Sequence, residues 1–365
     1  MRYATILLLI AGTALLVFTL ARADLGQAWS RLNDVGWSGV AVLAGLLLAA
    51  SLAQAGILMQ TVPTAGMTVR WTHALWKVWM VGEAFNTVTP LGSFGGEPVK
   101  AALLKKHYDV GLREATAALV LAQTIGIIAL VAFLVAGVVL MLRSPVLPPV
   151  FSTTAGFALA GFAGCVLLLF LTQRHGMLSR VARRLGGTHL GGRAQTVVEL
   201  VHDVEHRLIT FYTRQRGRFA LALGLGFSYW VFGMLRTYAT MAWLGRPITW
   251  TDAWIIEAGL LLVRSVFFLV PGNVGTQEAA LVMSCGAITG SSTLGLAMAI
   301  IRRVLELAWV GVGLLVGWTF SWAPAAVADP ARPSASDLPG LAAAARGSVL
   351  AQRLLAAACT RLSRA

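Results

Sequence analysis

Long runs of apolar residues, separated by short polar segments, occupy most of the chain. A helix needs roughly 20 apolar residues to cross about 30 Å of hydrocarbon. Six runs approach or exceed that length: 4–20, 40–59, 116–142, 155–171, 219–243 and 294–320. Two further runs, 71–89 and 254–270, end in proline and glycine. The pattern predicts an all-α polytopic membrane helical bundle with about six full spans and two re-entrant hairpins, about eight hydrophobic segments in all.

Composition also indicates that lipid is the solvent of this chain. Of its 365 residues, 57% are hydrophobic and 12% are charged, whereas a soluble domain carries about a quarter charged residues. The net charge of +14 would suit nucleic acid, but no basic block is interleaved with stacking aromatic residues. We therefore expect a multi-pass protein of the bacterial inner membrane whose partners are membrane lipids and not nucleic acid.

The basic residues are concentrated in a few loops. The insertion 173–218 is rich in arginine, so the positive-inside bias predicts that it is cytoplasmic. Within it, apolar residues at helical spacing predict an amphipathic surface helix; they are Val197, Val201, Val204, Leu208 and Phe211. A proline-containing linker and a basic amphipathic tail, 323–365, follow a predicted transmembrane domain, 1–322. The tail is expected to be cytoplasmic as well.

The first run resembles a signal peptide, because Ala21, Arg22 and Ala23 imitate a cleavage site. Its apolar part is longer than is usual for such a peptide, so we expect it to be retained. Counting crossings outward from the insertion 173–218 places the basic residues of segment 100–113 and the tail on the same side. The count requires both proline- and glycine-ended runs to return to the side from which they came.

The two interrupted runs match each other. Each has a proline, six residues and a glutamate, from Pro90 to Glu97 and from Pro271 to Glu278, an offset of 181 residues. The same offset superposes Glu83 on Arg264. By the crossing count the first interruption enters from inside and the second from outside. The sequence therefore predicts pseudo-symmetric inverted halves, about 36–142 and 219–320, which is the pattern of transporters with a site near the membrane midplane.

Charged residues beside the interruptions point to a polar cavity, since a charge in hydrocarbon needs a partner or water. They are Glu83, Glu97, Glu257, Arg264, Glu278, Arg302, Arg303 and Glu306. The arginines, with Lys77, could hold a phosphate or carboxylate, and the helices starting near Glu97 and Glu278 could direct positive dipole ends at an anion. The alternative is that these residues form internal ion pairs. A group of tryptophans is expected to anchor the bundle at the membrane interface: Trp71, Trp76, Trp79, Trp250 and Trp254.

An enzyme is a further alternative, because His202, Glu205 and His206 form an H-x-x-E-H pattern, which can hold zinc. The pattern lies in a short insertion with no evident third ligand, and the three cysteines are scattered. We expect no catalytic residue, metal site or cofactor.

Three segments resemble the flippase-like membrane family, which includes the transmembrane domain of lysylphosphatidylglycerol synthases and relatives found with hopanoid biosynthesis. They are PLGSFGGEPVKAALL starting at Pro90, VPGNVGTQE ending at Glu278, and the looser IIRRVLE ending at Glu306. The resemblance implies that the matching turn positions belong to the site: Asn86, Pro90, Gly95, Gly96, Glu97, Pro271, Gly272, Gly275 and Glu278. No aminoacyl-transfer domain follows residue 322, so we do not expect a complete lysyl-lipid synthase.

The resemblance implies movement of a lipid or lipid-linked molecule between leaflets or membranes, with a hopanoid or a phospholipid as candidate cargo. A non-catalytic accessory or scaffold subunit that binds lipid-biosynthesis enzymes is the alternative function. Either function is expected of an integral membrane protein and not of an enzyme.

Overall fold

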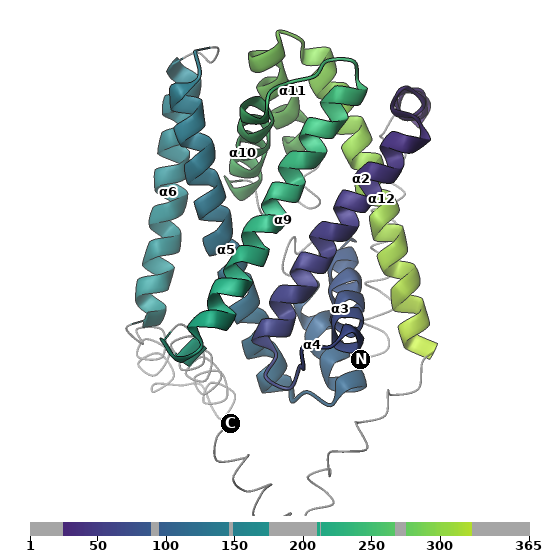
Figure 1. The fold of residues 1–365 in the computed structure, drawn as a ribbon, viewed down its shortest axis with the longest axis vertical. Coiled ribbons are helices and arrows are strands. Elements are labelled where there is room, and N and C mark those ends of the chain that lie inside the picture. The colour runs from purple at the N-terminus through teal and green to yellow at the C-terminus, as the bar shows by residue number, and fades with distance from the viewer. Residues whose placement is uncertain are drawn as a thin grey trace, which may run out of the picture.

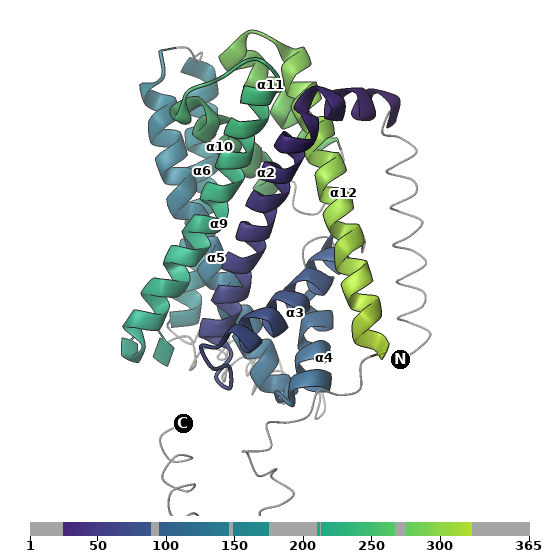
Figure 2. The ribbon, with the colours of Figure 1, turned by 45° about the vertical axis from the view of Figure 1, so that its right-hand side comes forward.

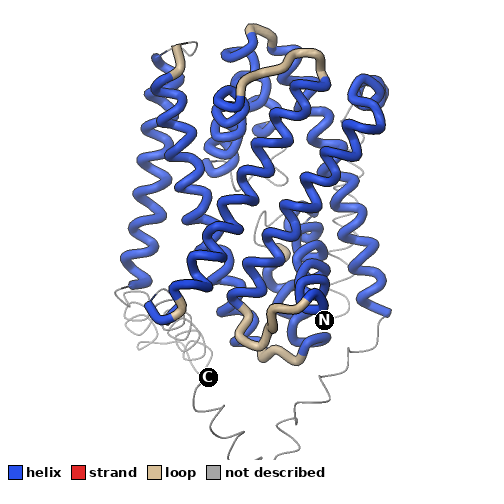
Figure 3. Tube along the Cα trace, viewed as in Figure 1, coloured by secondary structure: helices blue, strands red, loops and turns tan. Residues whose placement is uncertain are grey.

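The structure, a computed structural model, describes residues 25–88, 95–145, 149–174, 210–211, 213–266 and 275–322. Within these ranges every regular element is a helix (Figure 3), which confirms the all-α prediction. The helices are α2 (Leu25–Thr61), α3 (Val69–Val88), α4 (Glu97–Tyr108), α5 (Leu112–Arg143), α6 (Pro149–Arg174), α9 (Arg216–Trp243), α10 (Trp250–Val266), α11 (Thr276–Thr289) and α12 (Ser292–Trp322). The predicted span 4–20, most of the insertion 173–218 and the tail 323–365 lie outside the described residues.

Several helices have the length and composition of membrane spans. Among the described residues, Val35–Thr61 of α2, Leu112–Arg143 (α5) and Arg216–Trp243 (α9) meet both criteria, and α6 contains the shorter apolar stretch Thr153–Leu168. Helix α12 has 31 residues and is therefore about 46 Å long. The long helices stand side by side and tilt across the molecule (Figure 1). The arrangement is that of a polytopic membrane bundle, and the number of six full spans stays a prediction.

The two interrupted runs form helical hairpins at opposite ends of the bundle. Helix α3 packs on α4, and α10 packs on α11. Figures 1 and 2 show α3 and α4 at one end and α10 and α11 at the other, with the interrupted ends directed toward the middle of the molecule. The connecting residues 89–94 and 267–274 are outside the described ranges. Each hairpin returns to the end at which it started, as the crossing count required.

Helix packing shows the predicted internal repeat. Exchanging α2 with α9, α3 with α10, α4 with α11 and α5 with α12 maps the set of contacting helix pairs onto itself. Thus α12 packs on α3 as α5 packs on α10, and α9 packs on α5 as α2 packs on α12. Helices α2 and α9 pack against each other, and α6 lies outside the repeat, against α5 and α10. Because the hairpins lie at opposite ends, the two halves are inverted.

Helix ends that border the predicted cytoplasmic segments share one end of the bundle. Helix α5 begins, α6 ends, α9 begins and α12 ends at the end occupied by α3 and α4 (Figure 1). Segment 100–113 and the described residues that border the insertion 173–218 and the tail 323–365 therefore lie at a single end of the bundle. The division into a domain 1–322 and a tail stays a prediction.

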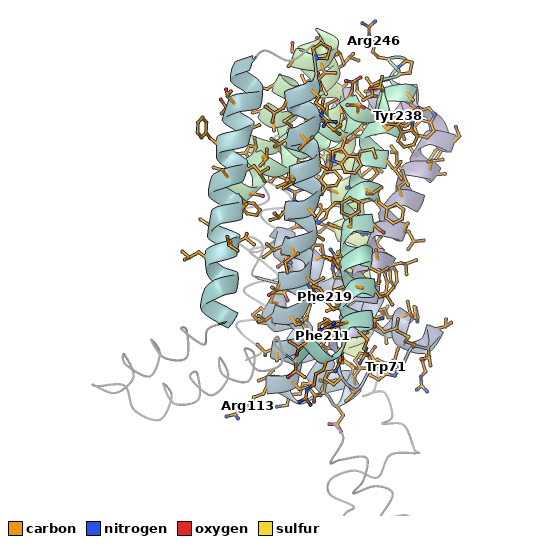
Figure 4. The ribbon with its side chains drawn as sticks, turned by 60° about the vertical axis from the view of Figure 1, so that its left-hand side comes forward. Trp71, Arg113, Phe211, Phe219, Tyr238 and Arg246 are labelled. Atoms are coloured by element: carbon orange, nitrogen blue, oxygen red, sulfur yellow. The ribbon has the colours of Figure 1, made fainter. Side chains whose placement is uncertain are left out.

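Aromatic side chains lie toward both ends of the bundle. Trp71 lies toward the α3–α4 end and Tyr238 toward the α10–α11 end (Figure 4). Tyr238 stacks on Trp250 with ring centroids 4.5 Å apart. Such positions suit aromatic rings that meet lipid headgroups. Trp79 differs, because it is only 7% exposed and packs in an apolar core cluster. The expectation that Trp79 is an interface anchor is therefore wrong.

Glycines allow the first helix of each hairpin to approach a long helix of the opposite half. A Cβ atom on Gly313 of α12 would lie 2.7 Å from the Met80 carbonyl oxygen and 2.9 Å from the Ala84 Cβ, both on α3. In the other half, a Cβ on Gly137 of α5 would meet the side chain of Ala258 on α10. A missing side chain at each crossing lets the backbones come close, which is how helices associate when lipid supplies no hydrophobic drive.

We expect Gly313→Ala to lower the free energy of unfolding by about 1–3 kcal/mol, the usual cost of inserting atoms into a packed contact. Unfolding of the purified protein from mixed detergent micelles, followed by circular dichroism, measures this. Gly311→Ala is the matched control, because no atom lies within 4 Å of a Cβ there and alanine favours the helix over glycine by about 1 kcal/mol. Equal stability of the two variants would contradict the close α3–α12 contact.

Candidate functional site

The most buried ion pair of the described chain joins α12 to α10. Arg302 donates from Nη1 to Oε2 of Glu257 and from Nη2 to Oε1, both at 2.8 Å. Thr237 of α9 donates a further hydrogen bond to Glu257 Oε2 at 2.7 Å. Glu257 is 1% exposed and Arg302 is 8% exposed. A bidentate geometry with an extra donor is what a buried pair needs to offset the loss of hydration.

Arg303, the next residue of α12, binds α11, which is the second helix of the α10–α11 hairpin. Arg303 donates to Glu278 Oε1 of α11 from Nη2 at 2.6 Å and from Nε at 3.0 Å. The second oxygen of Glu278 accepts the Gly275 backbone N–H at 2.7 Å. Gly275 has φ of 83°, a conformation that favours glycine. Glu278 therefore caps the start of α11 and anchors it to α12.

Glu306 connects these two pairs. Its carboxylate lies 3.6 Å from Arg302 Nε and 3.7 Å from Arg303 Nη1, and the Gln277 amide donates to both of its oxygens at 3.3 Å. One turn of α12 thus carries two arginines and a glutamate that bind α10 and α11. This is the polar cluster of the second half.

In the first half, the Asn86 side chain caps the start of α4. Its Oδ1 accepts the Gly96 backbone N–H at 2.7 Å, and its Nδ2 donates to Glu83 at 3.2 Å. A Cβ on Gly96 would collide with the carbonyl oxygen of Gly82 on α3. Only glycine therefore allows the start of α4 to lie against α3. Gly95 directly precedes this turn, while Pro90, Pro271 and Gly272 lie outside the described residues.

Glu97 is the counterpart of Glu278 in the first half. Its Oε1 accepts hydrogen bonds from Lys100 Nζ at 2.7 Å and from Gln123 Nε2 of α5 at 2.8 Å. Lys100 is only 3% exposed. Because α5 is the repeat equivalent of α12, Gln123 bonds Glu97 as Arg303 bonds Glu278. Each hairpin glutamate thus binds the long helix that follows it, through an amide in one half and a guanidinium in the other.

Helix α9 contributes two residues that the sequence interpretation missed. The Tyr229 side chain lies within electrostatic range of Glu83 of α3 and of Arg236, Arg264 and Arg302. It is therefore close to charged residues of both halves. Arg236 is the single charged residue of the apolar run 219–243, and a lone charge in such a run was the signal that could have identified it.

The structure thus gathers most of the predicted site residues into two groups. The second-half group contains Glu257, Arg264, Gly275, Glu278, Arg302, Arg303 and Glu306. The first-half group contains Glu83, Asn86, Gly96 and Glu97. Arg302 and Arg303 are both held by carboxylates, which agrees with the alternative of internal ion pairs for these two residues. The midplane cavity stays a prediction.

Metal chemistry finds no support in the described part of the chain, which holds no group of three or more His, Cys, Asp or Glu side chains that could bind a metal ion. The H-x-x-E-H pattern at residues 202–206 lies outside that part.

Comparison with family models gives a match over residues 5–314 to the model described as lysylphosphatidylglycerol synthase TM region. Comparisons with curated proteins and with solved structures gave no match. The matched range contains both hairpins and both groups of site residues.

Removing one partner of the buried Glu257–Arg302 pair leaves the other as an uncompensated charge. We expect Glu257→Gln to destabilise the protein by roughly 3–5 kcal/mol, measured by denaturant unfolding in detergent micelles. The double variant Glu257→Gln with Arg302→Gln should recover part of this loss, because neither member of the pair then remains as an uncompensated buried charge. Glu306→Gln is the control with a smaller expected loss, since Glu306 is 26% exposed and lies farther from its partners. A double variant no more stable than Glu257→Gln would show that the pair does not behave as a coupled unit.

Proposed function

The chain belongs to the family of the lysylphosphatidylglycerol synthase TM region, and we propose that it moves a lipid or lipid-linked molecule between the leaflets of the bacterial inner membrane. Membership makes it a membrane protein associated with lipid metabolism and confirms the resemblance found in the sequence. Our proposal adds a non-enzymatic, flippase-like transport activity, with phospholipids and hopanoids as candidate cargo.

The observation that carries the proposal is the polar cluster that α12 forms with the α10–α11 hairpin, inside an inverted repeat with hairpins at opposite ends. Charges inside an apolar bundle are costly and tend to mark substrate pathways. Interrupted helices in two inverted halves supply such pathways with polar groups near the midplane. A lipid headgroup could exchange its water for these groups while its acyl chains stay in the bilayer.

Alternating access is the mechanism that this architecture suits. Each hairpin packs on a long helix of its own half and, through α3 or α10, on a long helix of the other half. A small rotation of one half against the other would open the polar cluster first to one end of the bundle and then to the other. Transport by rocking of inverted repeats about a fixed site follows this scheme.

We propose that the α3–α4 end faces the cytoplasm. Exposed basic residues of this end include Lys105, Lys106 and Arg216, whereas Arg246 lies at the opposite end (Figure 4). The positive-inside bias favours the side with more lysine and arginine in short loops. The arginine-rich insertion 173–218 adds to this excess, because α6 ends and α9 begins at the α3–α4 end.

In liposomes of phosphatidylglycerol and phosphatidylcholine, the reconstituted protein should accelerate leaflet exchange of a fluorescent phosphatidylglycerol, followed by quenching of the outer leaflet with dithionite. Arg264→Ala and Glu278→Gln should each slow the exchange at least tenfold, because they remove a cation or the anchor of α11. Arg246→Ala, an exposed arginine outside the cluster, is the matched control and should exchange lipid at the wild-type rate.

Exchange in proteoliposomes no faster than in protein-free liposomes would rule out transport by the protein alone. In that case, loss of a lipid product in a deletion strain, without a change in its distribution between leaflets, would identify the accessory function instead.

The proposed orientation predicts opposite accessibility of two single cysteines in a background without native cysteines. Lys105→Cys should react with a membrane-impermeant maleimide only after cells are opened, and Arg246→Cys should react in intact spheroplasts. Both positions are exposed in the structure, so labelling reports the side of the membrane and not burial. The opposite pattern would reverse the orientation, and labelling of both from one side would contradict the topology.

A further inference from the structure

The arginines of the second-half cluster differ in whether a carboxylate forms an ion pair with them. Glu306 interacts electrostatically with all four of them, Arg236, Arg264, Arg302 and Arg303. Two of the four are engaged, because Glu257 binds Arg302 and Glu278 binds Arg303. The structure shows no ion pair or hydrogen bond for the guanidinium groups of Arg236 and Arg264 within the described ranges.

Arg236 is the more constrained of these two arginines. Its Nε is buried and has no hydrogen-bond partner among the described residues. Its guanidinium is also repelled by Arg302 across the cluster, while Glu257 attracts it without forming a pair. A buried guanidinium with an unused donor beside a like charge is unfavourable unless an acceptor completes its hydrogen bonds. An acceptor would complete these hydrogen bonds, and an anionic acceptor would also compensate the charge.

The remaining carboxylate near the cluster does not supply this acceptor. Glu83 acts on Tyr229, but its carboxylate accepts a hydrogen bond from Asn86 and forms no ion pair with Arg236 or Arg264. Arg236 thus forms no ion pair with the carboxylates of the two described groups.

The residues around Arg236 define the kind of anion that fits. Tyr229 precedes Arg236 by seven residues on α9, so both lie on the same helix face. The Tyr229 side chain lies within electrostatic range of Arg236 and Arg264, and both arginines lie within range of Glu306, so two guanidinium groups and a hydroxyl lie in the same region. Guanidinium groups bind phosphate and carboxylate oxygens through paired N–H donors, and several cationic donors with a hydroxyl suit a tetrahedral phosphate.

We propose that Arg236, together with Arg264 and Tyr229, binds the phosphate of an anionic phospholipid headgroup. The proposal rests on the proposed lipid-transport function and adds to it a binding residue on α9 that the sequence analysis did not name. Helix α9 suits this role because it contacts α2 and α5 of one half and α10 and α12 of the other. A headgroup held by α9 therefore lies where the two halves meet.

The test compares phosphatidylglycerol with a diacylglycerol that has the same acyl chains and no phosphate, using the purified full chain in detergent and native mass spectrometry. Wild type should retain phosphatidylglycerol at least tenfold more tightly than diacylglycerol. Arg236→Gln should lose most of this difference, Arg236→Lys should keep part of it, and the exposed control Arg246→Gln should keep all of it. Inorganic phosphate should compete with phosphatidylglycerol only weakly; competition at equal concentration would assign the same site to free phosphate instead of a lipid.

A second readout separates a binding residue from a structural one. In lipid-free detergent, Arg236→Gln should melt at or above the wild-type temperature, because it removes an unpartnered buried charge. An unchanged affinity of Arg236→Gln for phosphatidylglycerol would overturn the proposal, and a lower melting temperature with unchanged affinity would make Arg236 a structural partner of Glu257.

The binding and transport experiments together distinguish failure of the transport function from failure of the binding site. If wild-type protein does not exchange lipid between leaflets but binds phosphatidylglycerol through Arg236, the binding site holds and the transport function fails. If it exchanges lipid and binds phosphatidylglycerol without Arg236, the reverse is true.

Discussion

Two neighbouring guanidinium groups on α12 hold the second hairpin in place. Arg302 binds Glu257 on α10, and Arg303 binds Glu278 on α11. Consecutive residues of one helix therefore bind both helices of the hairpin. In an apolar bundle such contacts are strongly favoured once formed, because a carboxylate or guanidinium left alone has no water to solvate it. The position of the interrupted ends, and hence of the polar cluster, depends on these two pairs.

The two halves of the repeat anchor and cap their hairpins with different side chains. In each half a glutamate at the start of the second hairpin helix bonds the long helix that follows, through Gln123 in the first half and Arg303 in the second. The first half caps its interruption with Asn86, whereas the second uses Glu278 on Gly275. The inverted geometry is thus preserved while charge collects in the second half. An asymmetric charge distribution gives a symmetric fold a single polar cluster and not two equivalent ones.

The same cross-packing that builds the repeat also places the cluster between the halves. Helix α3 crosses α12 at Gly313, and α10 crosses α5 at Gly137, so neither hairpin belongs to its own half alone. Helices α2 and α9 pack against each other, and Tyr229 of α9 lies within electrostatic range of Glu83 of the first half and of Arg264 of the second. A polar group bound there would contact both halves at once, as a rocking transporter requires.

The sequence by itself determined the membrane class, the helical fold, the two interruptions and their inversion, because these follow from local properties. Run length sets a span, proline and glycine end a helix, and the positive-inside bias orders the crossings. Only the tertiary structure decided which side chains form ion pairs and hydrogen bonds with each other. Glu257 and Arg264 lie on the same helix, but the side chain that binds Glu257 is Arg302 of α12, 45 residues away. Likewise Gln123, Tyr229 and Arg236 join the site through helix crossings that no local pattern specifies. A long-range ion pair depends on the register of two packed helices, and packing against the whole bundle sets that register.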